Sequence, residues 1–98
     1  MSHQAQLSWT APSDATGSST YNIYRATASC PASGISGPTW TKIGTGITTT
    51  TYTDSTVAVG TTYCYYGTQV LNGAESVPSN TAGGSVGPNS ITIQLVLS

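Results

Sequence analysis

The sequence predicts an all-β protein, a two-sheet antiparallel β-sandwich, and three observations support this class. Residues 61–71 read as a long strand, because Tyr, Thr and Val suit a pleated surface. Asn72-Gly73 follows at once, and this pair favours a tight hairpin because both turn positions need positive φ. Turn residues recur roughly every ten positions, and no apolar period of 3.6 residues persists for a helical length. We therefore expect short strands in two packed sheets and no helix of consequence.

The composition fits one domain with an unusually uncharged surface. The chain has 98 residues, of which only 5% are charged, whereas an average soluble domain has about 25%. Its 18 Thr and 14 Ser predict strands whose solvent faces carry hydroxyl groups. Two Lys and Arg in total, with a formal net charge of −1, exclude a nucleic-acid binder and electrostatic attachment to anionic membranes.

The sequence also predicts no membrane segment. The longest apolar run, residues 95–97, is far too short to span a bilayer. Residues 1–4 lack the basic start and apolar stretch of a signal peptide. Either the chain is a mature form, or it leaves the cell without the usual export signal, as a virion protein released by lysis would.

The first strand is expected at residues 4–10. Apolar and polar residues alternate there, with Ala5, Leu7 and Trp9 on one face, and Pro12 stops the pattern.

The second strand is expected at residues 20–26, with Tyr21 and Ile23 facing inward. A long segment rich in Gly, Pro and Ser, residues 27–38, then interrupts the pattern. Shorter strands are expected at residues 40–43, at residues 49–54, and in a weak strand from 75 to 86.

Six segments, in this order, resemble a fibronectin type III domain. They are Leu7-Ser8-Trp9, Tyr21-Asn22-Ile23-Tyr24-Arg25-Ala26, Thr41-Lys42-Ile43, Thr51-Tyr52-Thr53-Asp54, Gly60-Thr61-Thr62-Tyr63 and Glu75-Ser76-Val77-Pro78-Ser79-Asn80. The resemblance spans about residues 4–86. It implies a seven-stranded sandwich in which sheet A-B-E faces sheet C′-C-F-G, and free-standing domains of this type resemble small phage structural proteins.

The resemblance also implies specific core roles. Trp9 would be the core tryptophan of strand B, and Val59 with Tyr63 would form the corner leading into strand F, where the tyrosine hydroxyl ties back to the backbone. Together with strand alternation, this predicts a core of Trp9, Tyr21, Ile23, Tyr52, Val59, Tyr63 and Tyr65.

Strand F departs from the family at two inward positions that are usually apolar. Gly67 leaves space that a large neighbour such as Trp40 or Trp9 could fill. Gln69 needs a hydrogen-bond partner or a place near the end of the sandwich, because an unpaired buried amide costs about 1–3 kcal/mol.

The larger departure is at the two ends of the chain. A normal strand A is missing, and an extra segment follows strand G, so we divide the chain into a sandwich at residues 1–86 and a strand extension at residues 87–98. Residues 91–97 alternate with period two, and their apolar face must be buried. That face consists of Ile91, Ile93, Leu95 and Leu97.

Three placements of this extension are open. It could form a hairpin on strand G, cross to lie parallel to strand B, or be donated to a neighbouring copy. We favour the hairpin slightly over donation. Donation would make the four apolar residues subunit contacts.

The family topology brings the end of strand C beside the start of strand F, which implies a disulfide between Cys30 and Cys64. Such a bond would add roughly 3–4 kcal/mol to stability and implies an oxidising final environment. The alternative is two unpaired thiols. Two Cys and one His without close spacing do not make a metal site, and we expect no cofactor.

The chain is not expected to be an enzyme. His3, Asp14, Asp54 and Glu75 are scattered and have no placed partner, and Asp54 suits local turn hydrogen bonds.

Protein binding is the class that remains. The hairpin tip after residue 71 lacks the Arg-Gly-Asp tripeptide used in integrin recognition. Trp40, Tyr24 and Tyr66, with the loop that contains Ile35, could form an aromatic contact patch or carbohydrate platform; we favour the alternative that Trp40 covers the sandwich.

Two functions are compatible with these expectations. The first is a non-catalytic structural or assembly protein, a virion surface subunit (head decoration or tail-associated) that contacts copies of itself or a larger assembly such as a capsid or filament. The second is a spacer or a glycan- or protein-binding accessory module of a secreted bacterial enzyme or adhesin. Both place the chain in a virion or outside the cell.

Overall fold

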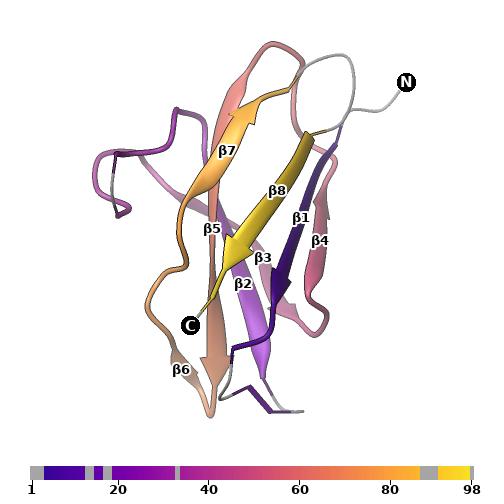
Figure 1. Cartoon of the computed structure of the whole chain (residues 1–98), viewed down its shortest axis with the longest axis vertical. Coiled ribbons are helices and arrows are strands. Elements are labelled where there is room, and N and C mark those ends of the chain that lie inside the picture. Colours follow the sequence, from indigo (N-terminus) through magenta and orange to yellow (C-terminus); the bar gives the residue numbers. More distant parts are fainter. Residues whose placement is uncertain (1–3, 13–14, 17–18, 33, 87–90, 98) are drawn as a thin grey trace.

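Eight strands in two sheets make up the part of the chain that the computed structural model describes, residues 4–12, 15–16, 19–32, 34–86 and 91–97 (Figure 1). The strands are β1 (Ala5–Thr10), β2 (Thr20–Ala26), β3 (Thr41–Ile47), β4 (Thr51–Asp54), β5 (Thr62–Leu71), β6 (Ala74–Glu75), β7 (Ala82–Ser85) and β8 (Ile91–Val96).

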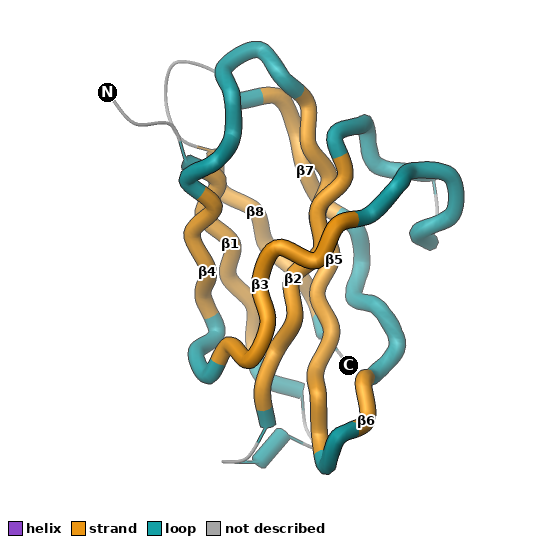
Figure 2. The backbone as a smooth tube through the Cα atoms, turned by 180° about the vertical axis from the view of Figure 1, so that it is seen from behind, coloured by secondary structure: helices purple, strands orange, loops and turns teal. Residues whose placement is uncertain are grey.

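The two sheets pack face to face, as the view from behind also shows (Figure 2). One has three strands in the order β4-β1-β8, and the other is built on β3-β2-β5, with β6 and β7 both paired to β5. The all-β sandwich predicted from the sequence is confirmed. The described strand pairs are antiparallel except β1 and β8, which run parallel.

Strand β5 is the centre of the larger sheet. It pairs with β2 over seven rows, from Thr20 opposite Val70 to Ala26 opposite Cys64. The hairpin to β6 forms where the sequence predicts it, since the following Asn72 and Gly73 have φ of 52° and 79°.

The core forms where the inward faces of the two sheets meet. Most of the predicted core residues are buried there: Trp9, Tyr21, Ile23, Tyr63 and Tyr65. Tyr52 is only half-buried at the rim, where its ring packs against the core and its hydroxyl donates to the carbonyl of Ile43 at 2.8 Å.

The corner before β5 forms with a different apolar residue from the one predicted. The Tyr63 hydroxyl accepts a hydrogen bond from the backbone N–H of Ala58 at 2.9 Å, which confirms the tie to the backbone. Val59 is 49% exposed, however, and Val57 is buried in its place. Val59 lies in a turn closed by the Thr61 N–H and the Ala58 carbonyl, with Gly60 at a φ of 82°, so its side chain is directed out of the core.

The space left by Gly67 is filled by Ile23 of the neighbouring strand β2 and by Leu95 of β8 across the sandwich, and not by either tryptophan. A Cβ at this position would lie 3.3 Å from Cδ1 of both Ile23 and Leu95. Gln69 is buried, and its backbone is held by Ser76: the Gln69 N–H donates to the Ser76 hydroxyl at 2.9 Å, and the Ser76 N–H donates to the Gln69 carbonyl at 2.7 Å.

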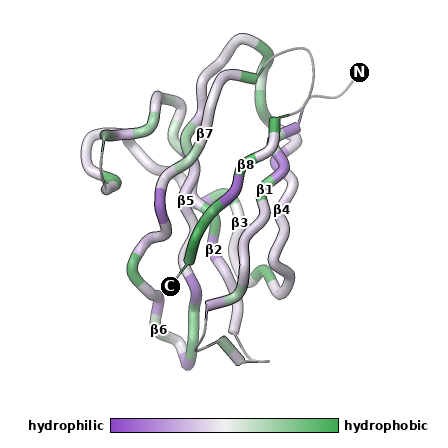
Figure 3. The backbone as a smooth tube through the Cα atoms, viewed as in Figure 1, coloured by the Kyte–Doolittle hydropathy of each residue, from purple (hydrophilic) through white to green (hydrophobic). Residues whose placement is uncertain are grey.

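The C-terminal extension is part of the sandwich. Strand β8 runs parallel to β1, from Ile91 opposite Ala5 to Val96 opposite Thr10. Figure 3 colours the C-terminal end of β8 as hydrophobic. The expected hairpin on strand G is therefore wrong, and so is the assignment of subunit contacts to this face. Of its four residues, Ile91 packs partly buried against the core and the others are buried in it: Ile93, Leu95 and Leu97.

The vacant edge of β1 explains this placement. Without β8, β1 would have unpaired backbone groups on the side away from β4, and the apolar face of β8 needs cover. Pairing the two within one chain satisfies both requirements without a second copy.

Candidate functional site

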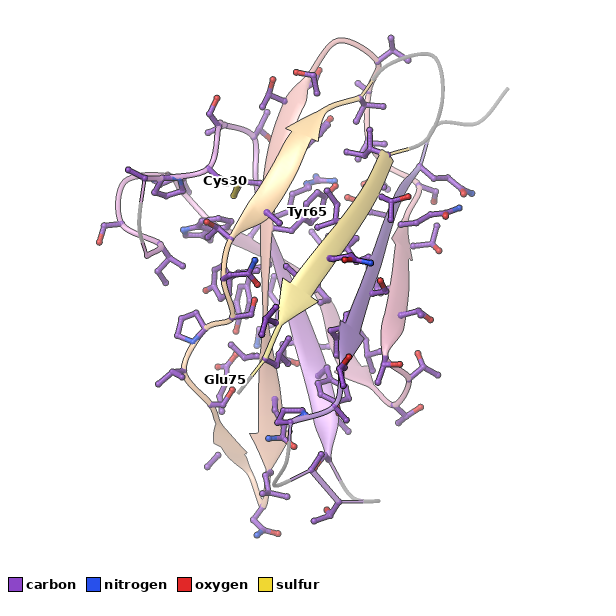
Figure 4. All side chains as sticks on the ribbon, in the orientation of Figure 1. Cys30, Tyr65 and Glu75 are labelled. Atoms are coloured by element: carbon purple, nitrogen blue, oxygen red, sulfur yellow. A yellow bond between two sulfur atoms is a disulfide. The ribbon has the colours of Figure 1, made fainter. Side chains whose placement is uncertain are left out.

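The predicted disulfide between Cys30 and Cys64 is present. Cys64 is fully buried on the outer face of β5, opposite Ala26 of β2. Cys30 belongs to the long loop between β2 and β3, so the bond holds that loop against the larger sheet (Figure 4).

Three aromatic rings and a lysine form a row beside the disulfide, which we call the aromatic row: Trp40, Tyr66, Tyr24 and Lys42. The Tyr24 and Tyr66 rings stack with centroids 4.6 Å apart, and Trp40 meets Tyr66 edge-on at 4.8 Å. Lys42 Nζ lies 5.7 Å from the centroid of the Tyr24 ring. The indole N–H of Trp40 donates to the carbonyl of Ile35 at 2.7 Å.

The aromatic row covers part of the larger sheet, with Tyr66 buried and Trp40 and Tyr24 half-buried. Tyr66 is 7% exposed, one face of the Tyr24 ring stacks on it, and Lys42 approaches that ring as well. A sugar-binding platform requires a free aromatic face. The arrangement therefore supports the interpretation that Trp40 and its loop cover the outer face of β5.

The Glu75 carboxylate lies at the end of this row (Figure 4), and we call it with its donors the outer cluster. Its Oε2 accepts hydrogen bonds from the hydroxyls of Tyr24 and Thr68 and from the amide of Asn22, the last at 3.2 Å. Hydrogen bonds from Thr68 and then Tyr24 hold the pKa of Glu75 below its usual value. Burial, followed by the bond to Glu75, raises the pKa of Tyr24 to about 12.

A second carboxylate cluster, which we call the inner cluster, lies at the rim of the core. Asp54 at the end of β4 is 3% exposed and forms an ion pair with Arg25 of β2, with Nη1 and Oδ2 2.8 Å apart. The hydroxyl of Tyr65 donates to the same oxygen at 2.9 Å. Thr56 donates its backbone N–H and its hydroxyl to the other oxygen, at 3.0 and 2.6 Å. The cluster therefore joins the two sheets.

The electrostatics of the inner cluster follow from these contacts. Burial alone would raise the pKa of Asp54, but the bonds from Thr56, Arg25 and Tyr65 outweigh it and hold the pKa below its usual value. Burial, and then the bond to Asp54, raises the pKa of Tyr65. The Arg25 guanidinium also lies over the Tyr63 ring, 5.1 Å from its centroid.

The inner cluster joins the two sheets, whereas the outer cluster links strands of the larger sheet only. Each has one carboxylate, and the two lie on opposite faces of the larger sheet. Within the described ranges, no three His, Cys, Asp or Glu residues lie close enough to hold a metal ion, and no helix is long and apolar enough to cross a membrane. His3 and Asp14 lie outside the described residues.

The sequence pointed to part of this arrangement. The local turn bonds of Asp54 to Thr56 confirm its expected role. Its partners on other strands, Arg25 and Tyr65, were missed. Both lie at inward positions of strands predicted to be neighbours, and they are opposite one another in the β2–β5 ladder. The alternation of inward and outward residues along these two strands could therefore have indicated that they meet.

Comparison with known proteins supports the fold. The chain is similar to the crystal structure of an Fn3-like protein from Clostridium thermocellum, with a TM-score of 0.51 and 27% sequence identity, over 95% of this chain and 86% of that one. No protein-family model matches the sequence. Comparison with curated protein sequences finds no significant match.

Proposed function

We propose that this Fn3-like sandwich is a non-catalytic structural module, a stable spacer with surfaces for protein contact, in a secreted or cell-surface bacterial protein. The observation that carries the proposal is the self-contained and cross-linked architecture. The apolar face of β8 is buried within the chain, and the Cys30–Cys64 bond holds the one long loop between described strands. Both features suit a unit that must keep its shape and carries out no chemistry.

The disulfide bears on the location. Disulfides form and persist in oxidising compartments and are rare in the cytosol. Cys64 is fully buried and Cys30 is half-exposed, so the bond is part of the packed fold. This supports a place outside the reducing cytoplasm.

The virion subunit has less support than the spacer. Its main argument was a strand available for donation to a neighbouring copy, and β8 is paired with β1 of its own chain. The uncharged, hydroxyl-rich composition is equally compatible with both settings. The similarity to an Fn3-like bacterial protein favours the module of a bacterial protein.

The experiment is fractionation of the organism that encodes the chain, with peptides of this sequence identified by mass spectrometry. We expect them in the secreted or cell-surface fraction with Cys30 and Cys64 oxidised. Recovery with capsid proteins in a density-purified particle fraction would replace the spacer with the virion subunit. Recovery in the cytosol with free thiols would contradict both.

A further inference from the structure

The free edges of the two sheets are protected to different degrees. Strand β3 carries Lys42, has register irregularities against β2 and includes Gly46 at a φ of 64°. Strand β4 has four residues, and β6 and β7 have two and four. These are the devices by which proteins keep edge strands from pairing with other chains.

Strand β8 has none of these devices along its six residues, Ile-Thr-Ile-Gln-Leu-Val. It has no charged residue, no proline and no bulge, and its pairing with β1 is regular from end to end. It is also the last strand of its sheet, in the order β4-β1-β8. Its outward-facing side chains are exposed.

Two hydrogen bonds establish which backbone groups of β8 point away from β1. The Ile91 N–H donates to the carbonyl of Gln4, so odd-numbered residues of β8 direct their backbone groups toward β1. Even-numbered residues therefore direct theirs away from it. The Val96 N–H confirms this, because it donates to the side-chain oxygen of Asn80 at 2.7 Å. Thr92 and Gln94 present their N–H and C=O groups at this edge, where no described strand is hydrogen-bonded to β8 and β7 of the other sheet lies nearby.

We propose that this edge binds a second copy of the chain, with β8 antiparallel to β8 about a two-fold axis at Ile93. Thr92 of one copy then faces Gln94 of the other, and the reverse. Each facing pair exchanges two N–H···O=C bonds, so the contact closes with four backbone hydrogen bonds. The inference goes beyond the function proposed above, since it holds wherever the chain operates.

Charge and packing are compatible with this partner. The outward-facing side chains of the paired segment carry the Thr92 hydroxyl and the Gln94 amide, so two identical strands approach without repulsion between charged side chains on β8. The pairing covers residues 91–95, because β8 begins at residue 91, and it therefore ends before Val96, whose N–H Asn80 already satisfies.

The test is light scattering and sedimentation of the full oxidised chain over a range of concentrations. A five-residue strand contact is at the small end of specific interfaces, so we expect dissociation on the order of 0.1–1 mM. Amide NMR signals of Thr92 and Gln94 should shift with concentration more than those elsewhere. A chain that stays monomeric to about 2 mM would overturn the proposal.

The decisive variant is Gln94→Pro. Proline removes an N–H that points away from β1, so the intramolecular ladder keeps its bonds while the dimer loses two of its four. We expect association at least tenfold weaker, while the matched control Gln94→Ala dimerises like the parent chain. Equal dimerisation of Gln94→Pro and Gln94→Ala would show that the contact lies elsewhere and refute the proposal.

A second variant guards against misfolding. If Gln94→Pro unfolds, Gln94→Lys keeps the backbone N–H and places like charges near one another across the seam. Circular dichroism and thermal unfolding of each variant establish that the fold is kept. A folded Gln94→Lys chain that dimerises as well as the parent chain would also refute the proposal.

Discussion

The inner and outer clusters use the same chemistry in two different environments. Asp54 and Glu75 each accept several hydrogen bonds, one of them from a tyrosine hydroxyl. Asp54 is 3% exposed and is paired with Arg25, whereas Glu75 lies on the exposed hairpin strand β6. Water can replace the partners of Glu75 but cannot easily replace those of Asp54, so similar contacts should differ several-fold in their contribution to the free energy of unfolding.

The largest effect is expected from Asp54→Ala. It leaves the Arg25 charge and the buried hydroxyl of Tyr65 without their partner, and breaking a pair of this kind costs about 3–5 kcal/mol. The measurement is urea unfolding, with Glu75→Ala as the matched control at about 1 kcal/mol or less. If Asp54→Ala does not fold, Tyr65→Phe can be measured instead, because it removes only the hydrogen bond from the Tyr65 hydroxyl to Asp54. Equal losses for Asp54→Ala and Glu75→Ala would contradict the role assigned to burial.

Removal of the disulfide is next in size. Replacing both Cys30 and Cys64 by Ala should lower the free energy of unfolding by roughly 3–4 kcal/mol, because the closed loop no longer restricts the unfolded chain. This change should loosen the loop over the aromatic row and leave the inner cluster intact. Urea unfolding gives the energy, and Trp40 fluorescence reports the loop. A variant as stable as the parent chain would show that the disulfide contributes nothing to the free energy of unfolding.

Acid should weaken both clusters, the inner one more. The pKa of Asp54 in the folded chain is below its usual 3.8, so the stability it contributes is present above pH 3.8 and is lost as the pH falls through the lower folded value. Glu75 follows the same sign from 4.5. Unfolding free energies measured from pH 6 to about 2 should fall less steeply in Asp54→Asn than in Glu75→Gln. A steeper fall in Asp54→Asn than in Glu75→Gln would show that Glu75 contributes more than Asp54 to the pH dependence of stability.

The smallest effect on stability is expected from Glu75→Gln, at about 0.5–1 kcal/mol for an exposed charge-assisted site. The sharper measurement is the ultraviolet titration of tyrosine. The pKa of Tyr24 is about 12 in the parent chain, partly because its hydroxyl bonds to Glu75, and it should move toward 10 when the charge is removed. Tyr65→Phe is the control, since it should leave this step unchanged. An unshifted Tyr24 step would indicate that burial alone sets its pKa.

Local patterns were sufficient where one strand or turn decides the outcome. The Asn72-Gly73 hairpin and the inward alternation of Tyr63 and Tyr65 depend on residues close in sequence. The tie of the Tyr63 hydroxyl to the backbone was implied by the family resemblance. The Val59 error has the opposite cause. Whether Val57 or Val59 enters the core depends on where the turn at Gly60 reverses the chain, and apolar identity alone does not distinguish them.

By itself, the sequence determined the all-β class, the central strand, the Cys30–Cys64 pairing through the family resemblance, and the need of residues 91–97 to bury one face. Only the tertiary structure decided where that face goes. The alternation of apolar and polar residues shows that a strand has a face to bury. Which strand it pairs with depends on which backbone edge is free in the folded chain. In the folded chain β8 pairs in parallel with β1, so its apolar face is buried within the same molecule. This pairing leaves the opposite edge of β8 as the surface to test.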